Sequence, residues 1–418
     1  MIDGRSTQTR RRLLVTCAGA TAGVAGLAGC TADDENDDGE NGDDGNGDGP
    51  GEFDEENAEY GVWPMAHYDA ANTAVAPNSG PESEPEKEWS VEVDSSPTVP
   101  VVANRTVFVG ERGGKYHGID LVDGETLWEH EPNEWGDLRG EENTIFTPSV
   151  SNTAVYVSGD GVEALEHSGE KLWTSDHDTL FNFRIYEETI YGRTNEYLYG
   201  IDEETGEEVL KIQASDEIET LAIDGERIIV ATRKGGEDFL LEGYERSSGD
   251  NLWNQAINDV RGAEPDIRIV DGTIYTVRDM EVISIEIESG DVESLYDFSE
   301  SNTRPAQPTV YDGRVYVPTE LPEVPVLNSE TGERVSEWEN RRLKGRTSWR
   351  MPISSETLYV WTPGTVNSPG VINALNPETG EKNWEMESTL TGHPTGPIVL
   401  EDSLLYADNS DNTIVLYR

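Results

Sequence analysis

Short segments of alternating polarity recur along most of the chain. Examples are Thr273–Val277 and Arg314–Val317, where β-branched and aromatic residues predominate and turn residues stand at both ends. A period of two with this composition predicts β-strands that each bury one face. The pattern excludes a helical solenoid and predicts an all-β fold.

Four such strands form a unit that repeats from residue 96 onward. The clearest copy has strands at Met351–Ser354, Leu358–Trp361, Val371–Leu375 and Lys382–Met386. A glycine in the turn before the fourth strand marks successive copies, at intervals of 37 to 48 residues. These glycines are Gly124, Gly169, Gly206, Gly249, Gly290, Gly332 and Gly380. Intervals of about 40 to 50 residues are typical of four-stranded propeller blades.

The two ends of the chain each hold an incomplete unit. Three strands are predicted at Thr395–Leu400, Ser403–Ala407 and Thr413–Tyr417, and a lone strand at Glu88–Val93. Pairing them in one sheet would close the ring and protect its first and last strands. We therefore predict an eight-bladed β-propeller of four-stranded antiparallel blades, in which an N-terminal strand joins the last blade. Seven blades are the alternative, if one irregular unit is an insertion.

Charge narrows the set of partners. The chain has 84 acidic and 30 basic residues, a formal net charge of −54. Such a surface repels a phosphate backbone, so nucleic acid is not an expected partner. We expect a solvated acidic surface, with specific cation binding as the alternative. This lysine-poor composition resembles that of proteins from salt-loving archaea. Because salt screens charge repulsion, we expect removal of salt to loosen the fold.

Residues 1–29 have the features of an export signal. Arg10 and Arg11 precede a run, Val15–Leu27, that is too short and too weakly apolar to span a membrane. The twin arginines resemble a Tat signal, which exports folded proteins. Leu27–Cys30 resembles a lipobox, which implies a lipid on the Cys30 thiol. The alternative is plain cleavage beside Cys30 and a freely secreted protein.

Residues 30–59 are predicted to be a disordered acidic linker. Fourteen acidic side chains lie between Thr31 and Glu59, with almost no large apolar residue. Such a segment cannot bury enough surface to offset its ordering entropy. The folded part, residues 60–418, contains no cysteine, and therefore no disulfide and no thiolate site. We expect a propeller tethered by lipid to the extracellular face of the cell membrane.

The segments Ala374–Trp384 and Gly118–Trp128 share the spacing Ala/Gly-x-Asp/Asn-x-x-x-Gly-x-x-x-Trp. This spacing resembles the tryptophan-docking repeat of the PQQ-like β-propeller family. The repeat weakens in the middle of the chain, where Leu210 and Ser294 replace the tryptophan and Trp338 falls two places late. The resemblance implies that each docking tryptophan packs between neighbouring blades on a turn glycine. Such residues would be structural, the alternative being a ligand-stacking platform. They are Trp89, Trp128, Trp173, Trp253 and Trp384.

The segment from Tyr60 to Thr73 resembles a lead-in found in archaeal and bacterial members of this family. We expect it to pack as a capping strap across the ring or along one blade edge. A functional lid is the alternative.

The resemblance allows two classes of function. Well-known members are alcohol dehydrogenases that hold PQQ and calcium at the ring centre, but no matching set of carboxylates and amides, and no cysteine, can be assigned in residues 60–418. Lipid-anchored members of the BamB type are instead binding proteins. We expect a monomeric, non-enzymatic module without cofactor or metal, which docks an envelope or secreted protein or another extracellular ligand. The alternative is a quinone-dependent dehydrogenase.

Few individual residues point to chemistry. The six histidines show no HExxH spacing, and no Gly-rich turn opens a helix. Arg184, Arg268 and Arg350 fall at equivalent inner-strand starts and are candidates for the channel rim. There they would either pair with inner acids or receive an acidic ligand. Asn104, in the sequence Asn-Arg-Thr, is a candidate glycosylation site at a hairpin turn.

Overall fold

The computed structural model describes Phe53 and the residues 59–132, 146–159, 161–177, 179–233, 238–257, 267–301, 303–338, 343, 351–362, 369–388 and 396–418. All of them belong to one compact unit, Asn46–Arg418. The predicted export signal, Arg10, Arg11, Cys30, almost all of the linker and Arg350 lie outside the described residues. Within these residues, no helix has the length and apolar character needed to cross a membrane.

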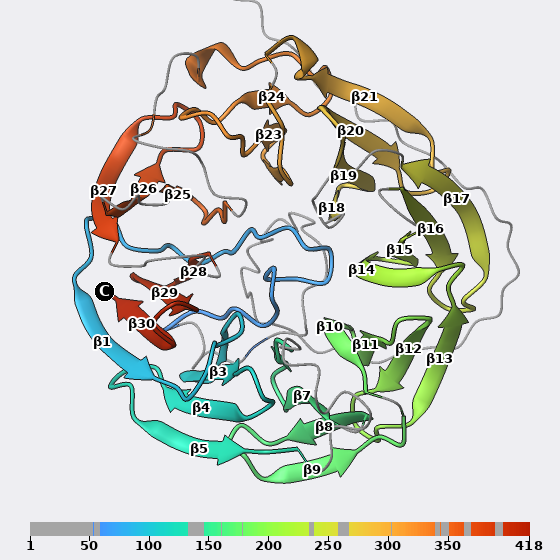
Figure 1. Cartoon of the computed structure of the whole chain (residues 1–418), viewed down its shortest axis with the longest axis vertical. Helices are drawn as coiled ribbons and strands as arrows, with labels where there is room; N and C mark the ends of the chain where they lie inside the picture. Colours follow the sequence, from blue (N-terminus) through green and yellow to red (C-terminus); the bar gives the residue numbers. More distant parts are fainter. Residues whose placement is uncertain are drawn as a thin grey trace, which may run out of the picture. The chain divides into compact units, whose positions relative to one another are not determined.

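Eight antiparallel sheets form the blades of a propeller, as predicted (Figure 1). Blades one to four have four strands each in the described residues. From the centre outward, blade one contains β2 (Val101–Ala103), β3 (Thr106–Gly110), β4 (Tyr116–Asp120) and β5 (Thr126–His130), and blade two contains β6 (Ser149–Val150), β7 (Val155–Gly159), β8 (Gly161–Leu165) and β9 (Lys171–Thr174). Blade three contains β10 (Phe181–Tyr186), β11 (Thr189–Arg193), β12 (Tyr197–Asp202) and β13 (Glu208–Gln213). Blade four contains β14 (Glu217–Asp224), β15 (Arg227–Arg233), β16 (Phe239–Glu245) and β17 (Asn251–Ile257).

Blades five to eight complete the ring. Blade five contains β18 (Arg268–Val270), β19 (Thr273–Arg278), β20 (Glu281–Glu286) and β21 (Val292–Asp297). Blade six contains β22 (Thr309–Tyr311), β23 (Arg314–Tyr316) and β24 (Val326–Asn328), with the 3-10 helices η2 (Ser299–Ser301) before and η3 (Ser336–Trp338) after them. Blade seven contains β25 (Leu358–Thr362), β26 (Gly370–Leu375) and β27 (Lys382–Ser388), and blade eight contains β28 (Ile398–Leu400), β29 (Ser403–Asp408), β30 (Thr413–Tyr417) and β1 (Lys87–Glu92). The inner strands are mostly buried and range from two residues in β6 to eight in β14, whereas the outer strands expose many of their side chains.

The eighth sheet combines both ends of the folded part. β1 pairs with β30 in antiparallel register, with Trp89 opposite Leu416 and Val91 opposite Ile414. The lone N-terminal strand thus lies in the same sheet as the last three strands.

Blades six and seven depart from the four-strand expectation. We expected a strand at Met351–Ser354, but among the described residues only two isolated bridges lie there, from Ile353 to Leu358 and from Ile353 to Val75. Pro352 has no N–H to donate, and the backbone of Ile353 bonds instead to Ala74 and Ala76 of the N-terminal lead-in. In blade six, Arg334 forms a bridge to Leu327 in place of a fourth strand, and the chain then enters η3.

Tryptophans join most blades to the next through the turn before the fourth strand, whereas Leu210 of blade three and Leu295 of blade five contact the glycine of the next turn instead. The indole Nε1–H of Trp128 donates to the carbonyl of His167 (2.8 Å), and that of Trp253 donates to Ile287 (2.8 Å). The same contact is made by Trp89, Trp173 and Trp384. The turn glycines have positive φ, and a Cβ on Gly290 would meet the Trp253 ring at 2.7 Å. The turn therefore needs glycine for both its backbone conformation and its close contact.

Replacement of Trp253 by alanine should lower the free energy of unfolding by about 3 to 5 kcal/mol, because it removes the indole packing between blades four and five and leaves a cavity. Urea unfolding followed by tyrosine and tryptophan fluorescence measures the change. The matched control is Leu252→Ala, one residue earlier on the same strand and 44% exposed. Equal stability of the two variants would contradict a docking role for Trp253.

Candidate functional site

The N-terminal lead-in runs through the middle of the ring (Figure 1). We call residues Tyr60–Gly80 the strap. Its two ends meet blade eight, where the Tyr60 carbonyl accepts from Glu401 N (3.0 Å) and Gly80 N donates to the Leu400 carbonyl (3.1 Å). The strap therefore enters and leaves on the same side of the ring.

Between these ends the strap bonds to the inner strands of most blades. It contacts blades one to five and the segment before β25 in blade seven. The contacts are Trp63 with Val102, Pro64 with Val150, the Met65 sulfur with Ile185 N, Ala70 with Ile223, Ala71 with Ile269, and Ala74 and Ala76 with Ile353. The sequence left open whether this segment crosses the ring or follows one blade, and the structure shows that it crosses.

Asn72 is the residue on which three blades converge. Its side chain is fully buried, and its amide nitrogen donates to the carbonyls of Leu221 and Ile267, both at 3.0 Å. Its amide oxygen accepts from Arg184 Nε at 2.6 Å. Its φ of 62° is a left-handed conformation that asparagine tolerates better than most residues. Sequence reasoning missed Asn72, because its partners are far away in the chain.

Two of the three candidate rim arginines donate hydrogen bonds to the strap. Arg184 is 4% exposed and Arg268 is fully buried. Arg268 donates to the carbonyls of Asn72 (2.8 Å) and Thr73 (3.1 Å). Both side chains thus hold the strap backbone or its asparagine, and Arg350 lies outside the described residues.

Asp69 is the acidic group of this centre. Its carboxylate accepts from the Thr73 backbone N–H (2.9 Å) and from the Thr73 hydroxyl. Burial raises the pKa of Asp69 to about 6, although the Thr73 hydrogen bonds and the charges of Arg268 and Arg184 act in the opposite direction. Asp69 therefore changes charge at mildly acidic pH.

A small cavity of about 10 Å³ lies beside the strap, with room for roughly one water molecule. It is lined by Trp63, Ala66, His67, Ala74, Val99, Arg268, Pro352, Gly396, Pro397 and Ile398. This lining contains no carboxylate or amide side chain, and calcium prefers oxygen ligands. Neither the volume nor the lining fits a quinone with calcium at this place.

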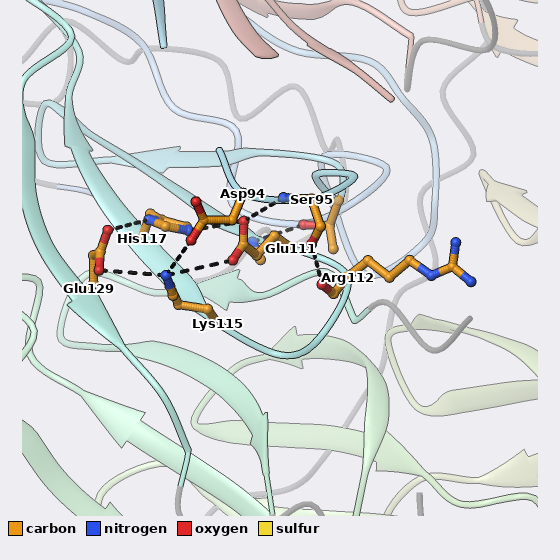
Figure 2. A network of polar contacts seen from close by, with 9 residues as sticks. Asp94, Ser95, Glu111, Arg112, Lys115, His117 and Glu129 are labelled. Carbon is orange, nitrogen blue, oxygen red and sulfur yellow. Dashed lines mark hydrogen bonds and ion pairs between the residues drawn. The ribbon is translucent and has the colours of Figure 1, made fainter. Parts of the chain in front are cut away.

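A second polar cluster lies where the chain passes from β1 to blade one (Figure 2). Lys115 contacts Asp94 (2.8 Å), Glu129 (3.8 Å) and Glu111 (3.9 Å), and His117 lies 3.6 Å from Glu111. Lys115 lowers the pKa of Asp94 by its hydrogen bond and charge. The ammonium group stands among the three carboxylates, so the cluster is an ion-pair network. In the part of the chain that the structure describes, no group of three or more histidine, cysteine or acidic side chains could hold a metal ion.

The candidate glycosylation site lies at a contact between blades. Asn104 and Arg105 form the hairpin turn after β2 with positive φ values. The Asn104 side-chain amide hydrogen-bonds the ring of His167 in blade two, and Thr106 is buried. Glycosylation of Asn104 remains a prediction, and a glycan would have to displace this contact.

The architecture matches known proteins. A family model described as outer membrane protein assembly factor BamB matches residues 73–190, 158–259 and 237–416. The chain belongs to this family.

Solved structures similar to this BamB-family propeller fall into different functional classes. BamB from Moraxella catarrhalis has 12% sequence identity and a TM-score of 0.54, over 80% of this chain and 99% of that chain. Quinohemoprotein alcohol dehydrogenase from Comamonas testosteroni has 12% identity and a TM-score of 0.57, over 85% of this chain and 80% of that chain. At this level of identity the likeness concerns the fold alone.

One curated relative matches part of the chain. Serine/threonine-protein kinase AfsK from Streptomyces coelicolor is 25% identical over 152 residues, which are 36% of this chain and 18% of the kinase. The BamB-family propeller therefore spans less than a fifth of that relative.

Replacement of Asp69 by asparagine should remove a pH dependence of stability. The folded state of the wild type binds this proton more tightly than the unfolded state, since the pKa rises from 3.8 to about 6. Stability therefore falls as pH rises from about 4 to about 6, by up to about 3 kcal/mol. Asp69→Asn keeps an acceptor for Thr73 N, so it should be more stable than the wild type at pH 7 but not at pH 4.

Thermal unfolding at pH 4, 5, 6 and 7 in constant salt measures this difference. Asp94→Asn is the control, because the pKa of the exposed Asp94 is lowered and its small contribution to stability has the opposite sign. An Asp69→Asn variant that differs from the wild type by the same amount at every pH would refute the assignment.

Proposed function

We propose that this protein is a non-enzymatic binding module that docks another protein of the cell exterior. Membership in the BamB family supports a role in binding or scaffolding. A rigid ring presents its loops and rim as a fixed surface, which suits recognition. The net charge of −54 argues against nucleic acid and leaves proteins as the favoured partners.

One observation carries the choice between binding and redox catalysis. In quinone-dependent members, the cofactor is held at the ring centre, the region that the strap crosses in this chain. Arg184 and Arg268 hold the strap by donating to Asn72 and Thr73, and the adjoining cavity has room for about one water. We therefore favour a module without PQQ, calcium or another cofactor.

The proposed site of action is the extracellular face of the cell membrane, in an organism adapted to high salt. The sequence motif at Arg10 and Arg11 supports Tat export, and the lipobox supports a lipid on Cys30. The acidic residues of the linker repel one another and would hold a monomeric propeller away from the lipid surface.

The proposal is tested by affinity capture of the tagged full-length protein from crosslinked membranes kept in concentrated salt. A single envelope or secreted protein recovered in stoichiometric amount is the expected result. In parallel, the purified protein is titrated with PQQ and calcium, and alcohol oxidation is measured. Tight PQQ binding with turnover would overturn the proposal in favour of a dehydrogenase, and absence of any partner would refute the binding role.

Cys30→Ser should abolish lipid labelling and move the protein from the membrane fraction to the medium, because it removes the thiol that receives the lipid. The measurement is metabolic labelling with a lipid precursor followed by fractionation. Cys17→Ser is the matched control and should leave both properties unchanged, since Cys17 belongs to the segment predicted to be removed. A Cys30→Ser protein that stays labelled would exclude this anchor.

A further inference from the structure

The acidic linker contains a single large apolar residue. Between Thr31 and Glu59 the chain has fourteen acidic side chains and no lysine or arginine, and the only leucine-sized or larger apolar side chain is that of Phe53. A solvated spacer gains nothing from an aromatic ring, since such segments owe their solvation to the scarcity of apolar groups. The composition thus sets Phe53 apart from the rest of the linker.

Phe53 packs against the ring. Its side chain is half-buried and lies against a cluster of buried apolar residues that joins blades one and two. We call this cluster the Phe53 seat. It draws residues from β2, β3 and β4 of blade one and from β6, β7 and β8 of blade two, among them Val101, Ala103, Phe108, Val150 and Val155.

The strap returns to the same two blades after Tyr60. The Trp63 backbone pairs with Val102 on β2, and the Pro64 carbonyl accepts from Val150 N (2.9 Å) on β6. Phe53 therefore contacts the pair of inner strands that the chain contacts again ten residues later. The attachment of the chain to the ring begins at Phe53, seven residues before the strap.

The seat is built by the blades themselves. The members that lie on strands are at most 2% exposed, and Trp128 packs against them while its indole donates to His167 (2.8 Å). Docking of these two blades thus uses contacts that do not involve Phe53. Loss of the Phe53 ring should therefore release the linker and leave the propeller folded.

Charge opposes this contact. Phe53 stands among Glu52, Asp54, Glu55 and Glu56, in a chain of net charge −54. Repulsion between these carboxylates and the acidic ring drives the linker away, whereas burial of the aromatic ring favours contact. Salt screens the repulsion and leaves the apolar contact in place. Concentrated salt therefore favours the docked linker, and dilute salt favours its release.

We propose that Phe53 is a salt-dependent anchor, which fastens the acidic linker of this chain to the junction of blades one and two. This inference goes beyond the proposed function and holds with or without a lipid on Cys30. With the lipid, the tether runs to the membrane from this junction, so the ring has a preferred orientation there. That consequence alone rests on the proposed function.

The seat takes Phe53 of its own chain in preference to that of a second copy. Seven residues separate Phe53 from Tyr60, whose carbonyl accepts from Glu401 N, so the aromatic ring is held at high effective concentration beside the seat. Approach of a second copy would bring two strongly acidic chains together.

The test measures the distance between the linker and blade two by double electron–electron resonance. The parent is the full-length chain with Cys17→Ser and Cys30→Ser, which carries no lipid. Nitroxide labels are attached at Gly51→Cys, in the linker, and at Ser168→Cys, in an exposed turn of blade two. Phe53→Ser removes the aromatic ring, and Phe53→Leu keeps an apolar side chain. Ala58→Ser is the matched control, because it also makes an apolar linker residue polar.

In about 3 M potassium chloride, where the Debye length is below about 3 Å, the parent, Phe53→Leu and Ala58→Ser should give narrow distance distributions. Phe53→Ser should give a distribution at least about twofold broader, because a free chain of the nine residues from Gly51 to Tyr60 spans about 17 Å r.m.s.. All four proteins should have the same melting temperature. Equal widths for the parent and Phe53→Ser would overturn the anchor.

The salt dependence is tested by lowering potassium chloride toward about 0.1 M, where the Debye length reaches about 10 Å. Only concentrations at which tryptophan fluorescence shows a folded ring are compared. The parent should broaden at a higher salt concentration than the triple variant Asp54→Asn, Glu55→Gln, Glu56→Gln. The same salt dependence in both proteins, or none in the parent, would overturn the role of salt.

Dilution of the labelled parent with unlabelled protein separates the two possible occupants of the seat. The narrow distribution should persist in an excess of unlabelled protein, since both labels belong to one chain. Its disappearance would show that Phe53 docks on a second copy and would overturn the proposal.

Discussion

The contact between an indole and the turn of the next blade is the interaction on which the ring depends. A single blade cannot bury both of its faces, so its stability comes from its neighbours. Each indole supplies a large apolar surface and one N–H donor, and the turn supplies a glycine and a carbonyl. Trp384 makes the contact with the carbonyl of Pro81, just before β1, so the interface between blades seven and eight uses residues from both ends of the folded part.

The strap also holds the blades together, through hydrogen bonds at the centre of the ring. Wedge-shaped blades leave a channel, and polar groups that face it need partners. The strap provides some of these partners and connects the consecutive blades three, four and five, through Asn72 and its contacts with Arg184, Leu221 and Ile267. The side-chain groups of Asn72 named here thus serve the attachment of the strap to the blades.

The sequence predicted the architecture well because it rests on local signals, namely the turn glycine and the tryptophan four residues later. It predicted the site less well because those contacts are nonlocal. Arg184 was placed correctly on an inner strand, but its partner Asn72 lies 112 residues away. Trp338 falls two places late in the repeat, yet its indole still donates to Pro377 (3.0 Å), because η3 replaces the strand and brings the ring back to the turn. Met351–Ser354 has the alternation of a strand, but the strap takes its backbone bonds.

The residue directly before the docking residue differs in polarity from blade to blade. In blades one to four, seven and eight, the pairing register shifts at the residue before the docking residue, so this residue is the extra residue of a β-bulge. In blades five, seven and eight the residue at the same distance from the turn is polar and exposed, namely Glu293, Asn383 and Glu88. In blades one to four it is leucine or valine, and each of these side chains is exposed on a separate sheet. Because single exposed apolar residues are normal on soluble proteins, this position tolerates either polarity, and the blades are specified by the docking residue and the turn glycine beside it.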